Sequence, residues 1–176
     1  MANTYVQIGS TVTVGAGGAA TIDFSSIPAT YTDFVIKLCG RGTTAAINAE
    51  VRMIFNGSSA SNYSWRQVQG NSSTASSTNF SSQSYVRVGY VPDTSATSNT
   101  FNNLEIYVPN YAGSIAKSLS SDSVQENNTS AAGEAIMQLI AGQWSLTNAI
   151  TQVTLSLNSG NFAQYSTASL YGISKS

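Results

Sequence analysis

Residues 150–173 read ITQVTLSL-NSGN-FAQYSTASLYGI, and this stretch decides the fold that the sequence predicts. Val153, Leu155 and Leu157 alternate with polar residues, which is the period-two pattern of a half-buried antiparallel strand. Gly160 stands among small polar residues that tolerate the positive φ of a tight turn. The stretch is therefore predicted to form a β-hairpin, with one apolar and one polar face on its first strand.

The same alternation recurs along the chain. It is clearest in residues 31–39, 50–55 and 101–108, and Asn56-Gly57 is the strongest short turn signal. The Ser/Thr/Asn-rich residues 70–78 are predicted to form a long surface loop. Residues 135–144 fit either a helix or a buried strand, and Gly142 together with the surrounding strands favours the strand. The sequence thus predicts an all-β protein of eight to ten strands, an antiparallel β-sandwich of jelly-roll-like form.

The beginning of the chain is predicted separately. Residues 1–20 alternate only weakly and end in a glycine-rich break, so they form either an edge strand or an extended arm. Residues 21–176 contain no linker and no fixed repeat, and they are predicted to form a single sandwich domain.

The composition excludes several kinds of partner. Only 9% of the residues are charged, against about 25% in an ordinary domain, so the surface is expected to be neutral and rich in hydroxyl groups. The seven basic residues form no cluster, which argues against nucleic acid. No apolar stretch reaches the roughly 18 residues of a membrane span, and the first residues lack the pattern of a signal peptide. Cys39 is expected to be a small buried hydrophobic residue.

Catalytic and metal chemistry is hard to build from this sequence. Histidine is absent, so a hydrolase would need Lys37 or Lys117 as its base, and both are expected to be solvated strand lysines. A single cysteine without histidine excludes a zinc site. The oxygen-rich residues 122–128 lack the spacing of a calcium loop. We therefore expect a protein that is no enzyme and that uses no metal and no cofactor.

A binding surface is the alternative that the sequence favours. Aromatic residues on the middle strands suit half-wet interfaces, although cross-strand core packing is the more common use of such rings, and Trp144 is expected in the core. Together with the apolar residues of the first strand, they define the predicted interaction surface: Tyr5, Val6, Ile8, Tyr63, Trp65, Arg66 and Tyr90.

Four stretches carry a resemblance to a known group of proteins. They are IDFSSIPATYTDF (22–34), IFNGSS (54–59), NTFNNLEIYVPNYAG (99–113) and SGNFAQYSTASLYGI (159–173). Together they resemble short virion proteins of tailed bacteriophages of marine and freshwater bacteria, cyanophages among them, over most of residues 22–173. The resemblance implies a jelly-roll-like sandwich, often trimeric, and carries over no site residues.

The resemblance implies one of two functions. The first is a capsid decoration (cement) protein, made in the host cytoplasm, that bridges subunits of the major capsid protein on the head. The second is a tail-fibre or receptor-binding module that recognises a host glycan or protein through residues 40–48 and 70–79. A third reading, a carbohydrate-active enzyme using Glu50 or Glu105, has only the carboxylates in its favour.

Overall fold

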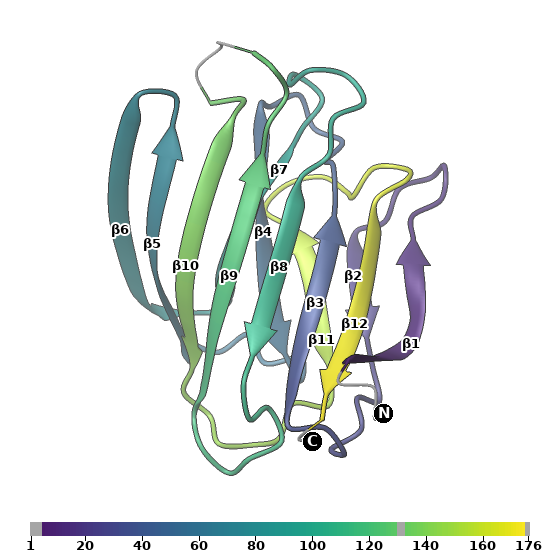
Figure 1. Cartoon of the computed structure of the whole chain (residues 1–176), viewed down its shortest axis with the longest axis vertical. Helices are drawn as coiled ribbons and strands as arrows, with labels where there is room; N and C mark the ends of the chain where they lie inside the picture. Colours follow the sequence, from purple (N-terminus) through teal and green to yellow (C-terminus); the bar gives the residue numbers. More distant parts are fainter. Residues whose placement is uncertain (1–4, 130–132, 175–176) are drawn as a thin grey trace.

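The computed structural model describes residues 5–129 and 133–174, and every regular element in them is a β-strand. The strands form two antiparallel sheets packed face to face, a large one in front of a small one in the view of Figure 1. The prediction of an all-β antiparallel sandwich is confirmed. The described residues contain no helix that is long and apolar enough to cross a membrane.

The large sheet has eight strands. In spatial order they are β1 (Tyr5–Thr13), β12 (Thr167–Ile173), β3 (Asp33–Cys39), β8 (Asn103–Val108), β9 (Lys117–Gln125), β10 (Ile136–Trp144), β5 (Tyr63–Asn71) and β6 (Thr74–Gln83). The small sheet has four strands. They are β2 (Thr21–Phe24), β11 (Val153–Leu157), β4 (Asn48–Phe55) and β7 (Val86–Pro92).

The order of eight of these strands is that of a jelly roll. The first strand pairs with the last, β1 with β12, and the next pairs follow inward: β2 with β11, β3 with β8, and β4 with β7. This is one long antiparallel ribbon of strand pairs that wraps into two facing sheets. The sheets β1-β12-β3-β8 and β2-β11-β4-β7 are therefore the jelly-roll core of the protein.

The remaining four strands are two insertions that meet. The hairpin β5–β6 is inserted between β4 and β7, and the hairpin β9–β10 between β8 and β11. In space β9 pairs with β8, and β10 pairs with β5, so both hairpins extend the same edge of the large sheet. We call the strands β9, β10, β5 and β6 the wing; it forms the left half of the sheet in Figure 1.

Apolar side chains fill the space between the sheets. Strand β4 turns Val51, Met53 and Phe55 inward, as its alternation predicts, and all three are fully buried. Trp144, also predicted in the core, packs its ring 5.5 Å from that of Phe55. Since burial of one such side chain contributes about 1.5–3 kcal/mol, this layer supplies the main drive for folding.

The stretch 150–173 contains two strands, as predicted, but they do not form a hairpin. Strand β11 lies in the small sheet beside β4, whereas β12 lies in the large sheet between β1 and β3. The connecting residues cross between the sheets, and their Phe162 is fully buried and bridges to Ala19 and Gly42. A buried phenylalanine in the connection holds the strands apart, so the local turn signal at Gly160 is wrong about pairing.

The second correction concerns residues 70–78. They were predicted to be a loop, yet they end β5 and begin β6, with a tight turn between Asn71 and Thr74. Strand β6 reads TASSTNFSSQ and is exposed on both faces, so it lacks the alternation by which strands are recognised. It is one of the strands that raise the total to twelve, above the eight to ten expected. The ambiguous residues 135–144 are a strand, as favoured.

Two further expectations fail and one choice is resolved. Residues 5–13 of the predicted arm or edge strand form an edge strand paired with β12. Cys39 is exposed rather than buried, because the end of β3 turns it to the outer side of the large sheet. Lys117 is fully buried rather than solvated, and its Nζ donates to three backbone carbonyl groups, those of Gly113, Ile115 and Thr147.

Candidate interaction surface

The outer side of the wing presents apolar side chains to solvent. In β10 the residues alternate strictly: Ile140 and Trp144 are buried between the sheets, whereas Met137 and Leu139 point outward. Val68 of β5 is the cross-strand partner of Leu139 and shares its face. Val68, Met137 and Leu139 are 57%, 62% and 62% exposed, which is unusual for large apolar residues in the middle of a sheet. We call these three residues the apolar patch.

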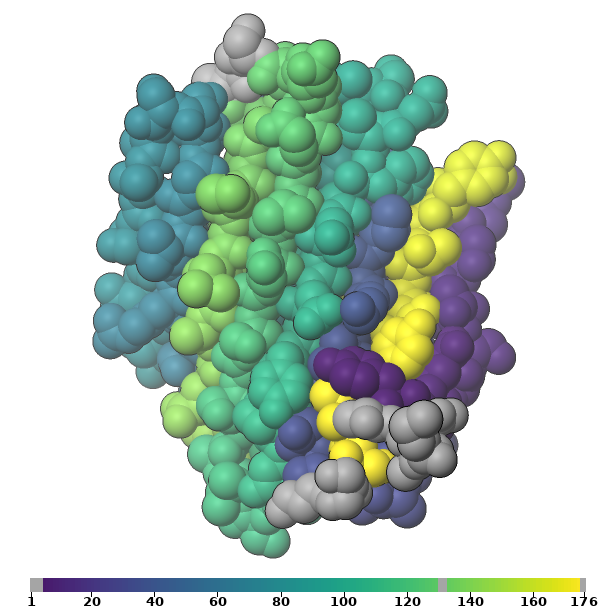
Figure 2. Space-filling model, in the orientation of Figure 1, coloured from purple at the N-terminus to yellow at the C-terminus, as the bar shows by residue number. Residues whose placement is uncertain are grey.

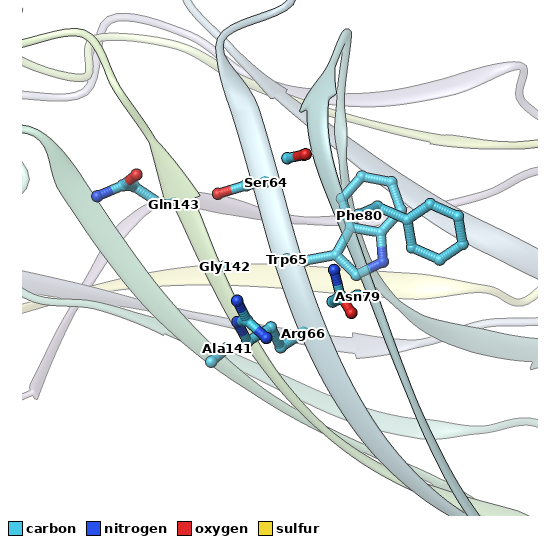
Figure 3. A pocket seen from close by; sticks show the side chains of 9 residues that line it. Ser64, Trp65, Arg66, Asn79, Phe80, Ala141, Gly142 and Gln143 are labelled. Carbon is cyan, nitrogen blue, oxygen red and sulfur yellow. The ribbon is translucent and has the colours of Figure 1, made fainter.

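The surface around the apolar patch is hollowed along the strands. Four shallow hollows of about 340, 340, 600 and 470 Å³ follow one another on the outer side of the wing. Neighbouring hollows share lining residues, and Figure 2 shows the depression between β5 in blue and β10 in green. Figure 3 shows the first of them, where Arg66 lies close to Ala141 while the rings of Trp65 and Phe80 lie together beside it.

Two charged side chains stand beside the apolar patch without a partner. Arg66 on β5 and Asp122 on β9 are both exposed, and neither makes an ion pair or a side-chain hydrogen bond in the described residues. Every other charged side chain of the described residues has a hydrogen-bond or ion-pair partner. Leu139 is the direct cross-strand partner of both Val68 and Asp122, so the free charges flank the patch.

The outer side of the jelly-roll core is built differently. Val35 of β3 occupies a similar outward position, but its cross-strand neighbours are Tyr107 and Tyr171, and Val35 is only 1% exposed. In the next row Lys37 forms an ion pair of 3.0 Å with Glu105. This pairing raises the pKa of the Lys37 amine, chiefly through the hydrogen bond to Glu105. Here the chain covers its own apolar residue and pairs its own charges.

The inner side of the wing is held by a polar network. Arg87 of β7 is buried; its guanidinium donates to Glu50 and to Tyr90 at 3.1 and 2.9 Å, and it also donates to Gln67 of β5. Gln69 of β5 accepts hydrogen bonds at 3.0 and 3.1 Å from two further glutamines, Gln67 and Gln138. Hydrogen bonds to a charged group contribute about 1.5–3 kcal/mol when buried, so Arg87 links the wing to the small sheet.

An aromatic stack covers the inner side of β6. The Phe80 ring stacks on Trp65 with centroids 5.0 Å apart, and Tyr85 lies 5.4 Å from Trp65 on another side. Trp65 is buried, whereas Phe80 is 43% exposed. The Arg52 guanidinium lies 4.2 Å over the Tyr85 ring, which adds a cation–π contact. Phe80 is the aromatic ring of this group that solvent reaches best.

The predicted interaction residues on the middle strands divide into two groups. Tyr63 and Trp65 are core residues: Tyr63 is buried, its hydroxyl accepts from the Phe55 amide and donates to the Ser58 carbonyl, and Trp65 lies under Phe80. Their burial corrects the expectation that their rings lie on the surface. Tyr90 is half-buried beside Arg87, and Arg66 is exposed on the wing.

The predicted residues of β1 lie at the opposite edge of the large sheet. Tyr5 is exposed and its ring is 6.5 Å from that of Tyr171. Val6 and Ile8 point to the inner side and are half-buried, Ile8 against the core. The structure therefore does not bring the predicted residues together at one surface.

Sequence reasoning missed the residues that the structure does bring together, namely Val68, Leu139, Met137 and Asp122. For Met137 and Leu139 the signal was the run IMQLIA at 136–141, in which apolar residues occur at both parities of a strand. A strand with one face in the core and one in solvent needs only one apolar parity. Apolar residues on the second face of this strand were the sign of a further contact.

The ionisable groups of the described residues form no metal site. No group of three or more His, Cys, Asp or Glu side chains in the described ranges is placed to hold a metal ion. Lys37 is exposed in its ion pair, as its predicted solvation requires. Burial lowers the pKa of the Lys117 amine, which its three backbone carbonyl partners hold in place.

Comparisons of the sequence with protein-family models and with curated proteins gave no match.

Proposed function

We propose that this chain is a non-enzymatic structural protein of a bacteriophage virion, and that it decorates the capsid by bridging subunits of the major capsid protein. The observation that carries the proposal is the outer side of the wing. There, two hairpins inserted between strands of the jelly-roll core expose apolar side chains to solvent. Such a surface suits a contact between proteins. The resemblance of residues 22–173 to virion proteins supplies the setting.

The mechanism is addition of many weak contacts. A decoration protein stabilises a shell under internal DNA pressure by burying surface across the joints between subunits. Each contact contributes little, but copies that hold several neighbours at once bind far more tightly than one contact alone. The low charge of the chain fits a role in which apolar and hydroxyl groups make the contacts. The trimer that the resemblance implies stays a prediction.

The experiment is the copy number of the chain in purified particles of the phage that encodes it. Quantitative mass spectrometry against the major capsid protein should find hundreds of copies per particle. About a dozen copies would move the protein to the tail, and absence from purified particles would contradict both positions.

The second candidate is a tail-fibre or receptor-binding module for a host glycan or protein. Phe80 favours it, because a partly exposed ring backed by Trp65, with the Arg87 guanidinium 6.0 Å from its centroid, combines stacking and polar groups as sugar sites do. Phe80→Ala should abolish adsorption to host cells or binding on a glycan array if this function holds. Unchanged binding by the folded variant would remove the argument.

A further inference from the structure

We infer that the outer side of the wing is a self-association surface, on which a second copy of this chain packs about a two-fold axis. This inference makes the contact on the outer side of the wing one between two copies of the chain rather than one with the capsid protein, and it does not depend on where in a virion the chain lies. It starts from the apolar patch of Val68, Met137 and Leu139, the large apolar side chains that β5 and β10 expose on this side. Nothing else in the described residues covers them.

The two unpaired charges indicate which partner binds the outer side of the wing. Arg66 and Asp122 are of opposite sign, are exposed and are unpaired in the described part of the chain. They lie on β5 and β9 with β10 between them, one cross-strand row apart. From strand spacing and rise their Cα atoms are about 12 Å apart, and the structure forms no ion pair between them.

The placement of the two charges is self-complementary. Ala141 is the cross-strand partner of Arg66, and Leu139 is the partner of Asp122, so the point midway between the charges falls on β10 between Ala141 and Leu139. A two-fold axis in the plane of contact, through this point and at right angles to the line between the two charges, exchanges the two positions. Arg66 of each copy then faces Asp122 of the other, and the apolar patches pack against each other around Leu139.

The size of the surface sets the expected strength. Four strands of about nine residues make a face of about 19 by 30 Å, or about 570 Å² per copy. A standard stable interface buries about 800 Å² per partner, so this dimer is at the weak end. We therefore expect a dissociation constant in the micromolar range, which becomes effective when copies are crowded together.

The test is the molar mass of the purified chain by sedimentation equilibrium up to several hundred micromolar. The wild-type mass should rise toward twice the 18.4 kDa of one chain. The double variant Val68→Ser/Leu139→Ser should bind itself about 100-fold more weakly, because centrally placed anchors carry most of the affinity. Ile115→Ser is the matched control: Ile115 is 56% exposed, lies outside the wing, and its change should leave the dimer intact.

Folding of each variant is checked by circular dichroism. Because Arg66 is exposed and makes no ion pair or side-chain hydrogen bond in the described residues, Arg66→Asp is a second variant that should keep the fold, and it should weaken the dimer through paired like charges. A wild-type chain that stays monomeric over the whole concentration range would overturn the inference. This holds even if capsids bind the chain through the outer side of the wing. A trimer that the double variant abolishes, or a dimer that the double variant leaves unchanged, would also overturn it.

Discussion

Val35 and Leu139 are apolar residues on the same outer side of the same sheet, yet Val35 is 1% and Leu139 62% exposed. In the jelly-roll core the rows that run across the strands are closed by the chain itself, with Tyr107 and Tyr171 beside Val35 and Glu105 paired to Lys37. In the wing the corresponding rows are left open, with a free arginine and a free aspartate beside Leu139. The difference sets the wing apart as the part of the large sheet that leaves Leu139 and two charged side chains without partners in the described residues.

The largest expected effect separates the two faces of β10. Ile140 is fully buried, so Ile140→Ala should lower the free energy of unfolding by about 2–5 kcal/mol through lost burial and a cavity. Leu139→Ala, one residue away, should change it by less than about 0.5 kcal/mol. Urea unfolding at a low protein concentration, where the chain is monomeric, measures both. Equal losses would mean that Leu139 serves the fold of the monomer.

The next effect concerns the link between wing and core. Arg87→Met removes the buried partner of Glu50 and Gln67 and should cost about 3 kcal/mol of unfolding free energy. Amide hydrogen exchange should accelerate most in β5 and β6. Arg52→Met is the control, since Arg52 is the more exposed partner of Glu50 and should cost about 0.5 kcal/mol. Uniform acceleration over all strands would show that the wing does not open separately.

The salt dependence of the dimer dissociation constant tests the charge contacts on the wing. If Arg66 and Asp122 pair between copies, raising the salt concentration from about 0.05 to 1 M should weaken the wild-type dimer about fivefold, because exposed ion pairs are screened. The Arg66→Gln dimer, weaker at the start, should respond little. Sedimentation at two salt concentrations gives both dissociation constants. A wild-type dimer that tightens with salt would leave only apolar contacts at this surface.

The smallest effect lies on the jelly-roll half. Glu105→Gln should return the pKa of Lys37 toward its ordinary value of 10.5, because the hydrogen bond to Glu105 is what raises it. A raised folded-state pKa gives stability that is present below pH 10.5 and is lost as the pH rises through the folded value. Both side chains are about half exposed, so the loss should stay under about 0.5 kcal/mol. NMR titration of Lys37 measures the shift, and an unchanged pKa in the variant would contradict the pairing.

The sequence predicted the strands whose apolar and polar residues alternate. It missed a strand without that alternation and the sheet to which the last strand belongs. The inward faces of β4, β8 and β10 follow from period two, because one side of each strand packs in the core. Strand β6 buries no residue and touches the core only through the Phe80 ring on Trp65, so its serine and threonine residues predicted a loop. The sheet to which β12 belongs depends on long-range packing of Phe162, which no local turn signal contains.

The candidate surface shows the same limit. Arg66 was selected from the sequence, but Asp122 and Leu139 become its neighbours only when the two inserted hairpins pair. Arg66 on β5 and Asp122 on β9 are 56 positions apart in the chain (122 − 66). Only the pairing of β10 with both strands places one free charge on each side of the apolar patch.

The most direct test of self-association mixes two charge variants, Arg66→Asp and Asp122→Arg. Alone, each should be largely monomeric at concentrations where the wild type dimerises, because the two-fold contact sets like charges against each other twice. Mixed in equal amounts, they should form a 1:1 heterodimer with near wild-type affinity, since both contacts become opposite in sign. A mixture that stays monomeric, or single variants that dimerise like the wild type, would contradict the account.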